Sequence, residues 1–499
     1  MPFAVVLAAG FMTLLDVSIV NVALPSIEAN LGASPHEIQW IIAGYALTFG
    51  LTLVAAGRGG DIFGRRLFFL VGLSGFVLAS AGCGFATDAT MLALARLLQG
   101  MFAGILNPQV LGIMQDLFKG PARARAFGVF GIVVGISTAI GPALGGVLIG
   151  LAPPDIGWRL VFLINLPIGA VVLPLAAKYL PRSRGIRDRR GSLWGQFDLV
   201  GVILVGLTVV LVMWPFLSSS GEGGSTNGAG GAPYWLLGVA GVMMVVTYGW
   251  ERWWYTRGNE VLLDPVLTRN SAFVLGTLTS FFYFAGFTSI FITITLYLQQ
   301  GMGWTPLQAG VAVIPFALIS GAASGVSGRL VNRFGRLVPI TGALIVTVAM
   351  VIMAACALWV PLPAQPYAVL TAMATAGIGS GLIISPNQAL TLNEVPGKSA
   401  GIAAALLQTF QRLGTAIGLA VVTTVYFRTL ATYGGYDKSG MALAMAALII
   451  AALTLLAFAS SVADAFRRRR LTVRTDTGGE AKMERGKDSA KRTQETERE

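Results

Sequence analysis

The stretch AFGVFGIVVGISTAIGPALGGVLIG, residues 126–150, decides the fold of this chain. It is apolar throughout and long enough to cross a bilayer as a helix, for which about 20 residues are needed. Glycines at four-residue spacing leave a groove on one helix face, into which a neighbouring backbone can pack closely. The residues that form this pattern are Gly131, Gly135, Gly141, Pro142, Gly145 and Gly146. Such a groove favours packing between helices that move against each other. The alternative explanation is tight, static helix packing of the kind found in any polytopic membrane protein.

The composition also indicates a membrane protein. Of the 499 residues, 55% are hydrophobic and only 12% are charged, which is too apolar for an ordinary soluble domain. The net charge of +12 comes from short loops and the C-terminal tail, so we expect contacts with membrane lipids and no nucleic-acid partner. Two cysteines in apolar stretches and one histidine, His36, give no disulfide, metal or cofactor pattern. The first apolar stretch has full-span length, so we expect no cleavable signal peptide.

Fourteen apolar stretches are long enough to span a membrane. They lie near 4–24, 38–57, 67–86, 89–115, 126–150, 158–178, 196–216, 234–254, 273–298, 306–328, 337–360, 366–392, 400–427 and 440–463. Lysine and arginine concentrate in the loops that follow even-numbered spans. By the positive-inside rule this places both termini in the cytoplasm, and the protein in the cell membrane.

The two halves of the chain repeat each other. GRGGDIFGR at 57–65 returns as GRLVNRFGR at 328–336, and TAIG at 138–141 returns at 415–418. Parallel repeats of this kind are typical of transporters. We therefore expect an all-α fold with a six-helix bundle over 1–180, a cytoplasmic linker and two inserted transmembrane helices over 181–272, a second six-helix bundle over 273–464, and a disordered charged cytoplasmic tail over 465–499.

Asp16 is the acid that lies deep inside a span, and a charged residue in that place is a functional candidate by default. At 1.5 Å per residue, Asp16 lies about 18 Å from the inner end of its span, and Arg96 about 9 Å from the outer end of another. Because these depths nearly coincide in a core of about 30 Å, a pair between the two residues is geometrically permitted, and we expect them to carry proton coupling. A static buried ion pair that fixes helix packing is the alternative.

Other polar residues inside the spans are candidates for a substrate cavity. They are Asn21, Gln99, Asn107, Gln109, Asn387 and Arg412. For the amides, hydrogen bonding between helices is an equally good explanation. Arg412 has no acidic residue at its depth, and two roles fit it: contact with an anionic group of a substrate, or extension of its side chain toward the membrane surface.

Four stretches together resemble a known family. LDVSIVNVALP at 15–25, GRGGDIFGRR at 57–66 and RLLQGMFAG at 96–104 resemble the first-helix, loop and fourth-helix motifs of the major facilitator superfamily. The glycines of 131–146 resemble its fifth-helix antiporter motif, and the fourteen spans resemble its drug:proton antiporter branch. The resemblance covers about residues 4–463. It implies the major facilitator fold, with two six-helix bundles plus two inserted helices, 14 transmembrane helices in all.

The resemblance also implies a role for the turn at 57–66. In this role Asp61 forms a conformational latch with the N-terminus of an opposing helix and a nearby arginine. The residues involved are Gly57, Arg58, Asp61, Gly64, Arg65 and Arg66. Asn332 replaces the acid in the second half, so we expect a weaker latch there. A solvated loop whose charges only set the topology is the alternative.

These patterns favour one function over its competitors. We expect a proton-coupled antiporter that exports amphipathic organic compounds by alternating access, acting as a monomer. A proton-coupled uptake symporter is the alternative within transport, and the glycine–proline pattern of 131–146 distinguishes the two. A membrane-embedded transferase would need a cluster of acids or histidines that this sequence lacks. We therefore expect no enzyme activity.

Overall fold

The computed structural model describes residues 1–181, 198–219, 233–258, 261, 265–395, 399–433 and 439–496. The basic linker at 182–197 and most of the loop at 218–233 lie outside the described residues. The same holds for the side chains of Asn21, His36 and Pro142, and for the side chains beyond residue 467.

The first half of the chain forms seven helices that pack around one another. They are α1 (Pro2–Leu31), α2 (Pro35–Phe63), α3 (Arg65–Gly84), α4 (Ala89–Leu117), α5 (Pro121–Leu151), α6 (Pro154–Leu163) and α7 (Asn165–Tyr179). Local sequence sets several of their ends. Ser34 and Glu37 form a capping box at the start of α2, and the Asp88 side chain accepts a hydrogen bond from Met91 N at the start of α4.

The stretch at 158–178, expected as one helix, is divided between α6 and α7 at Ile164. Pro167 lacks the N–H that would continue the helical hydrogen bonds across this point. The break places Asn165 at the first position of α7, deep among the other helices.

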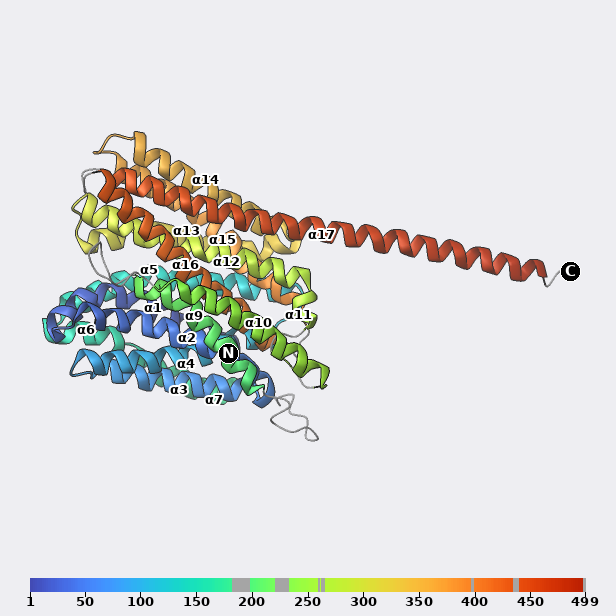
Figure 1. Ribbon diagram of the computed structural model, residues 1–499, viewed down its shortest axis with the longest axis horizontal. Coiled ribbons are helices and arrows are strands. Elements are labelled where there is room, and N and C mark those ends of the chain that lie inside the picture. The colour runs from blue at the N-terminus through green and yellow to red at the C-terminus, as the bar shows by residue number, and fades with distance from the viewer. Residues whose placement is uncertain are drawn as a thin grey trace.

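The second half forms an equivalent set of helices. After the short α11 (Pro265–Arg269) come α12 (Ser271–Leu296) with a π-helical end, η1 (Tyr297–Gly301), then α13 (Pro306–Phe334), α14 (Leu337–Trp359), α15 (Gln365–Asn393), α16 (Ala400–Tyr433) and α17 (Ser439–Thr496). Figure 1 shows the two halves one above the other, with their helices running roughly along the long axis.

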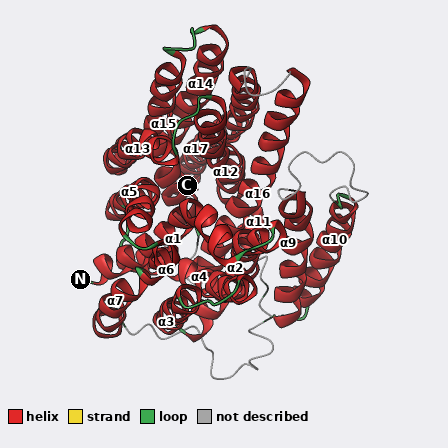
Figure 2. Cartoon of the chain, turned by 90° about the vertical axis from the view of Figure 1, so that its left-hand side faces the viewer, coloured by secondary structure: helices red, strands yellow, loops and turns green. Residues whose placement is uncertain are grey.

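Two helices lie between the halves in the sequence, α9 (Leu199–Ser219) and α10 (Trp235–Thr256). Figure 2 places them at the edge of the molecule, with α9 on the side of α2 and α16. Val209 and Met213 of α9 form a small apolar cluster with Ala416 of α16, against which Ala46 and Leu47 of α2 also pack. Helix α9 therefore touches both halves.

The charged tail, for which the sequence predicts disorder, follows the last apolar stretch. Helix α17 continues to Thr496 and extends away from the rest of the molecule (Figure 1). The tail is rich in Glu, Lys and Arg, whose side chains favour helices. We call the end of the molecule from which it extends the tail end; α2, α4, α13 and α15 also end there.

Eleven of the described helices are long and apolar enough to cross a membrane, so the chain is a multi-pass membrane protein. The predicted count of fourteen is met only in part. The three remaining expected spans correspond to α5, α9 and α10, which are not among the eleven; in α9 the described apolar stretch is Val200–Pro215.

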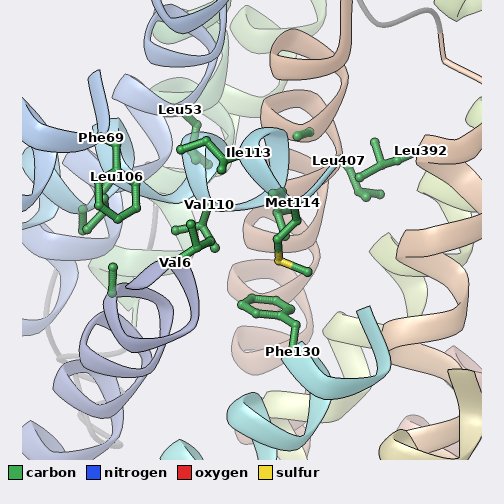
Figure 3. Packing of buried hydrophobic residues seen from close by; sticks show 14 of the residues in the cluster. Val6, Leu53, Phe69, Leu106, Val110, Ile113, Met114, Phe130, Leu392 and Leu407 are labelled. Atoms are coloured by element: carbon green, nitrogen blue, oxygen red, sulfur yellow. The ribbon is translucent and has the colours of Figure 1, made fainter. Parts of the chain in front are cut away.

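A continuous apolar core joins the two halves toward the tail end. It includes Val110 and Met114 of α4, Phe130 of α5, Leu392 of α15 and Leu407 of α16. Figure 3 shows Met114 between Phe130 on one side and Leu407 and Leu392 on the other. Side chains from both halves thus exclude water from this part of the seam between them.

Candidate functional site

Asp16 and Arg96 form a buried ion pair inside the first half. Nη1 of Arg96 donates to Oδ2 of Asp16 over 2.8 Å. The Asp16 side chain is fully buried and that of Arg96 is 3% exposed. The pairing that their depths permit is therefore present, and breaking such a pair on one side typically costs about 3–5 kcal/mol.

Three further side chains complete a polar network around this pair. Gln99 Nε2 donates to Asp16 Oδ1 at 2.8 Å, and Asn165 Nδ2 donates to the same oxygen at 3.0 Å. Both amides also donate to Ser80 Oγ, which itself donates to the carbonyl of Phe162 at 2.9 Å. The network links α1, α3, α4, α6 and α7, so a change in the charge of Asp16 acts on five helices.

Asn165 and Ser80 were not predicted from the sequence. Both are fully buried. Asn165 carried a usable signal, because it is an amide inside an apolar stretch, like the amides that were selected. Ser80 carried none, since serine is common in membrane helices and its role depends on which helices meet.

The Arg96 side chain is held in place by several groups. Its Nε donates to the carbonyl of Ile41 at 3.2 Å, and its Nη1 also donates to Gln99 Oε1 at 2.7 Å. The guanidinium lies over the Tyr45 ring at 4.2 Å, a cation–π contact that partly replaces lost hydration. This arrangement fixes the guanidinium beside the carboxylate of Asp16.

Asp61 bridges the two halves at the tail end. Its carboxylate accepts hydrogen bonds from the backbone N–H groups of Gly401, at 3.0 Å and 3.2 Å, and of Ile402, at 3.1 Å. Both belong to the first turn of α16, where free N–H groups and the helix dipole favour a negative charge. The contact implied for the turn at 57–66 is therefore present in the structure.

Arg65 ties this contact to the first half. It donates to Asp61 Oδ1 at 3.0 Å and to the carbonyl of Gly112 at 2.6 Å, and it pairs with Asp116 at 2.8 Å. Arg66 donates to the carbonyl of Ala177, and Arg58 is buried. Residues 57–63 form the last turns of α2, and Arg65 and Arg66 begin α3, so the turn expected at 57–66 is helical on both sides of Gly64.

Two glycines of the turn have distinct structural roles. A Cβ at Gly57 would lie 2.6 Å from Ala405 Cβ and 2.7 Å from the carbonyl oxygen of Gly401, so glycine allows α2 and α16 to touch. Gly64 has a φ of 103°, which a side chain would strain. It alone separates α2 from α3.

The glycines of α5 face two different helices. Those nearer its start pack against α13 of the other half: a Cβ at Gly135 would lie 2.9 Å from the carbonyl oxygen of Ala317. At Gly131 it would collide with the hydroxyl groups of Ser324 and Ser385. Ser324 in turn donates to the carbonyl of Gly128 at 3.2 Å. This part of the groove lies between the halves.

The later glycines pack within the first half, against α1. A Cβ at Gly145 would meet Ile19 Cγ1 at 3.0 Å, and one at Gly141 would collide with Ser18. Gly146 is half-buried. The expectation of one continuous groove is therefore corrected, because α5 leaves the seam as it crosses the molecule.

The amides selected as cavity candidates make contacts between or within helices. Gln109 Nε2 donates to the carbonyl of Ala56 at 2.8 Å, and Asn387 Nδ2 to that of Gly276 at 2.8 Å. Asn107 is half-buried and donates to Ala103 of its own helix, while Gln99 belongs to the Asp16 network. For these residues the structure favours the alternative role, which is to join helices.

Arg412 lies in the seam between the halves. It is half-buried, and its guanidinium lies over the ring of Phe49 on α2 at 4.3 Å. A small pocket, with room for about one water molecule, lies elsewhere in the seam, among Gly131, Ser320 and Ser380. Among the described residues, no group of three His, Cys, Asp or Glu side chains could hold a metal ion.

The fold and the site thus define a multi-pass helical membrane protein whose two halves meet along a seam closed at one end. The sequence model of the Major Facilitator Superfamily matches residues 6–419, and this chain belongs to that superfamily.

Relatives and solved structures agree with this assignment. A probable actinorhodin transporter of Streptomyces coelicolor is 33% identical over 85% of this chain and 72% of its own length. A puromycin resistance protein of Streptomyces alboniger is 35% identical over 86% and 82%. A methylenomycin A resistance protein of Bacillus subtilis is 30% identical over 89% and 92%. The solved proton:xylose symporter XylE has the same fold, with a TM-score of 0.66, 13% identity and coverage of 92% and 94%.

Proposed function

We propose that this protein is a proton-coupled antiporter that exports amphipathic organic compounds by alternating access. The observation that carries the proposal is its similarity, over more than four fifths of the chain, to proteins named for antibiotic transport or resistance. Protons, the exported compound and membrane lipids are its proposed partners. No cofactor and no enzyme activity form part of the proposal.

The proposed topology has fourteen spans and both termini in the cytoplasm. The three helices beyond the eleven apolar ones, α5, α9 and α10, complete the count. The tail end carries Arg65, Arg123 and Arg336 at the starts of α3, α5 and α14, and positive charge at the ends of spans favours the cytoplasmic side. The first bundle is proposed to cover 1–180, the inserted segment 181–272, the second bundle 273–464 and the tail 465–499.

In this orientation the structure represents a state closed toward the cytoplasm. Several contacts between the bundles gather at that end: Asp61 on the first turn of α16, Arg123 donating to Asn393 at 3.2 Å, and the close packing of Gly57 on Ala405. Opening toward the cytoplasm requires these contacts to separate. We propose that Asp61 acts as a latch that stabilises the closed state.

Proton coupling is assigned to Asp16. A proton on its carboxylate removes the charge that faces Arg96, and it weakens the hydrogen bonds donated by Gln99 and Asn165. Because these donors lie on α4 and α7, protonation shifts the relative stability of two helix arrangements. The proton released to one side thus drives the bundles to reorient.

A transport assay tests this function. The purified protein is reconstituted in liposomes, a pH gradient is imposed, and movement of labelled antibiotics is followed in both directions. An antiporter moves the compound against the direction of proton flow, whereas an uptake symporter moves both the same way. Co-directional movement would contradict the proposal, and so would transport that ignores the gradient.

A further inference from the structure

The embedded charges of the two bundles are not balanced. Asp16 is paired with Arg96, whereas no carboxylate among the described residues forms an ion pair with Arg412. The guanidinium of Arg412 instead lies over the Phe49 ring, and Tyr45 is close enough to interact with it electrostatically. An unpaired cation inside a membrane protein is costly unless something else compensates it.

The surroundings of Arg412 supply hydrogen-bond donors that lack acceptors. The Tyr45 hydroxyl is buried, with the residue 4% exposed, and it has no hydrogen-bond partner in the structure. Gln408 lies one helical turn before Arg412 on α16, and its buried Nε2 also has none. Buried donors without partners destabilise a protein unless a ligand or water satisfies them. The Arg412 guanidinium, the Tyr45 hydroxyl and the Gln408 amide all require a hydrogen-bond acceptor. Of the three, only Arg412 is charged.

The position of this cluster suits a substrate. Phe49 and Arg412 lie two helical turns from the contact of Gly57 with Ala405, along helices that run in opposite directions. The cluster therefore lies in the seam, beyond the part that is closed at the tail end. A molecule bound there would touch both bundles.

We propose that Arg412, with Tyr45 and Gln408, binds the anionic group of an amphipathic substrate, so that the transporter selects anions over cations of similar skeleton. This rests on the proposed export function and narrows its substrate class. A cationic group would find no equivalent partner in Asp16, whose carboxylate is fully buried and already accepts from Arg96, Gln99 and Asn165. Arginine suits the role because its charge is permanent and its donors match a carboxylate or phenolate.

A binding experiment on the purified protein in detergent tests the proposal separately from transport. The probes are fluorescein and rhodamine 123, which share a xanthene ring system but carry opposite charge, and binding is read from fluorescence anisotropy. We expect fluorescein to bind the wild type at least tenfold more tightly than rhodamine 123. Arg412→Gln should lose at least tenfold for fluorescein only, and Arg412→Lys, which keeps the charge but not the planar set of donors, should retain the preference for fluorescein at a lower affinity.

Two further variants serve as controls. Tyr45→Phe keeps the ring beneath Arg96 but removes the hydroxyl, and it should weaken fluorescein binding severalfold. Arg428→Gln removes an exposed arginine from the same helix and should change nothing. The proposal is overturned if fluorescein fails to bind, if it binds no better than rhodamine 123, or if Arg412→Gln weakens both probes equally.

Transport of the same probes in liposomes separates this proposal from the export function. A charge preference in binding without proton-driven transport would support the anion site and contradict the antiporter. Proton-driven export without a charge preference would contradict the anion site alone.

Discussion

At the scale of single residues, the carboxylate of Asp16 connects charge to helix position. It accepts hydrogen bonds from three side chains on two other helices, α4 and α7. Asp16→Asn keeps the shape but removes the charge permanently. We expect this variant to abolish efflux driven by a pH gradient while it still reaches the membrane, as measured in everted vesicles. Efflux at the wild-type rate would remove Asp16 from the coupling mechanism.

Asn165 is one of the two network residues that were not predicted from the sequence, and it offers a second test. Asn165→Ala removes donors to both Asp16 and Ser80, and the loss of buried hydrogen bonds to a charged group costs about 1.5–3 kcal/mol. We expect gradient-driven efflux to fall at least tenfold and the thermal midpoint to drop. Asn107→Ala is the matched control, because that amide donates only within its own helix at 3.0 Å. Equal effects of the two changes would argue against a special role for Asn165.

Residue-scale prediction from the sequence succeeded where depth alone was sufficient. Asp16 and Arg96 could be paired because the helical rise gives each a depth in the membrane. The neighbours of Asp16 could not be predicted in this way, because the angle between helices decides which amide reaches it. Gln99 was accordingly selected for a cavity, although it belongs to the ion-pair network.

At the scale of helices, α5 contacts both bundles, and two of its glycines allow a matched comparison. A Cβ at Gly135 would press on the backbone of α13 in the other bundle, whereas one at Gly145 would press on α1 in its own. Overpacking typically costs about 1–3 kcal/mol. Gly135→Val should therefore open the tail end, and Gly145→Val should lower stability without favouring either state.

Cysteine labelling measures this difference. Ala405→Cys, in a background without Cys83 and Cys356, reports whether the tail end is open, because residue 405 is fully buried in the closed state. From the cytoplasmic side, the cysteine at 405 should be labelled severalfold faster in the Gly135→Val variant than in the Gly145→Val variant. Equal rates would mean that the α5–α13 contact does not move during transport.

The contact of Asp61 with α16 can also be tested at the scale of helices. Asp61→Asn removes the negative charge from the first turn of α16, where it is worth about 1–2 kcal/mol in a partly buried setting. We expect the population open at the tail end to rise up to about tenfold, since 1.4 kcal/mol corresponds to a factor of ten. Labelling of the same cysteine at 405 checks this. An unchanged labelling rate would mean that the charges of the turn only set the topology.

The sequence predicted the helices better than their partners. Four-residue glycine spacing in 126–150 indicates a groove, yet the same spacing serves α13 at Gly135 and α1 at Gly145. Which helix fills the groove depends on how α5 tilts across the molecule. That tilt is a property of the packed bundle and is not encoded in any local pattern.

At the scale of the whole molecule, the number of spans determines where the termini lie. An even number places both ends on one side, whereas eleven spans would place them on opposite sides. We expect reporter fusions at both termini to register the cytoplasm, in agreement with fourteen spans. A C-terminal reporter outside the cell would contradict the inclusion of α5, α9 and α10 among the spans.

The overall architecture was predictable because the chain repeats itself and because apolar length is a strong signal. The disorder of the charged tail stays a prediction. The attachment of α9 to both bundles could not be predicted, because lipid-facing and protein-facing sides of that helix are both apolar.

The single-residue connection at Gly64 limits how fast the tail end can open. Helices α2 and α3 are joined by one residue, and Arg65 is bonded to both Asp61 and Gly112. Asp61 therefore cannot separate from α16 through a local movement of the turn. Loop fluctuations take nanoseconds to microseconds, but collective helix movements take microseconds to milliseconds. Release of Asp61 therefore belongs to the slower class. The tail end can therefore open between thousands and about a million times per second at most. Each export cycle requires one such opening.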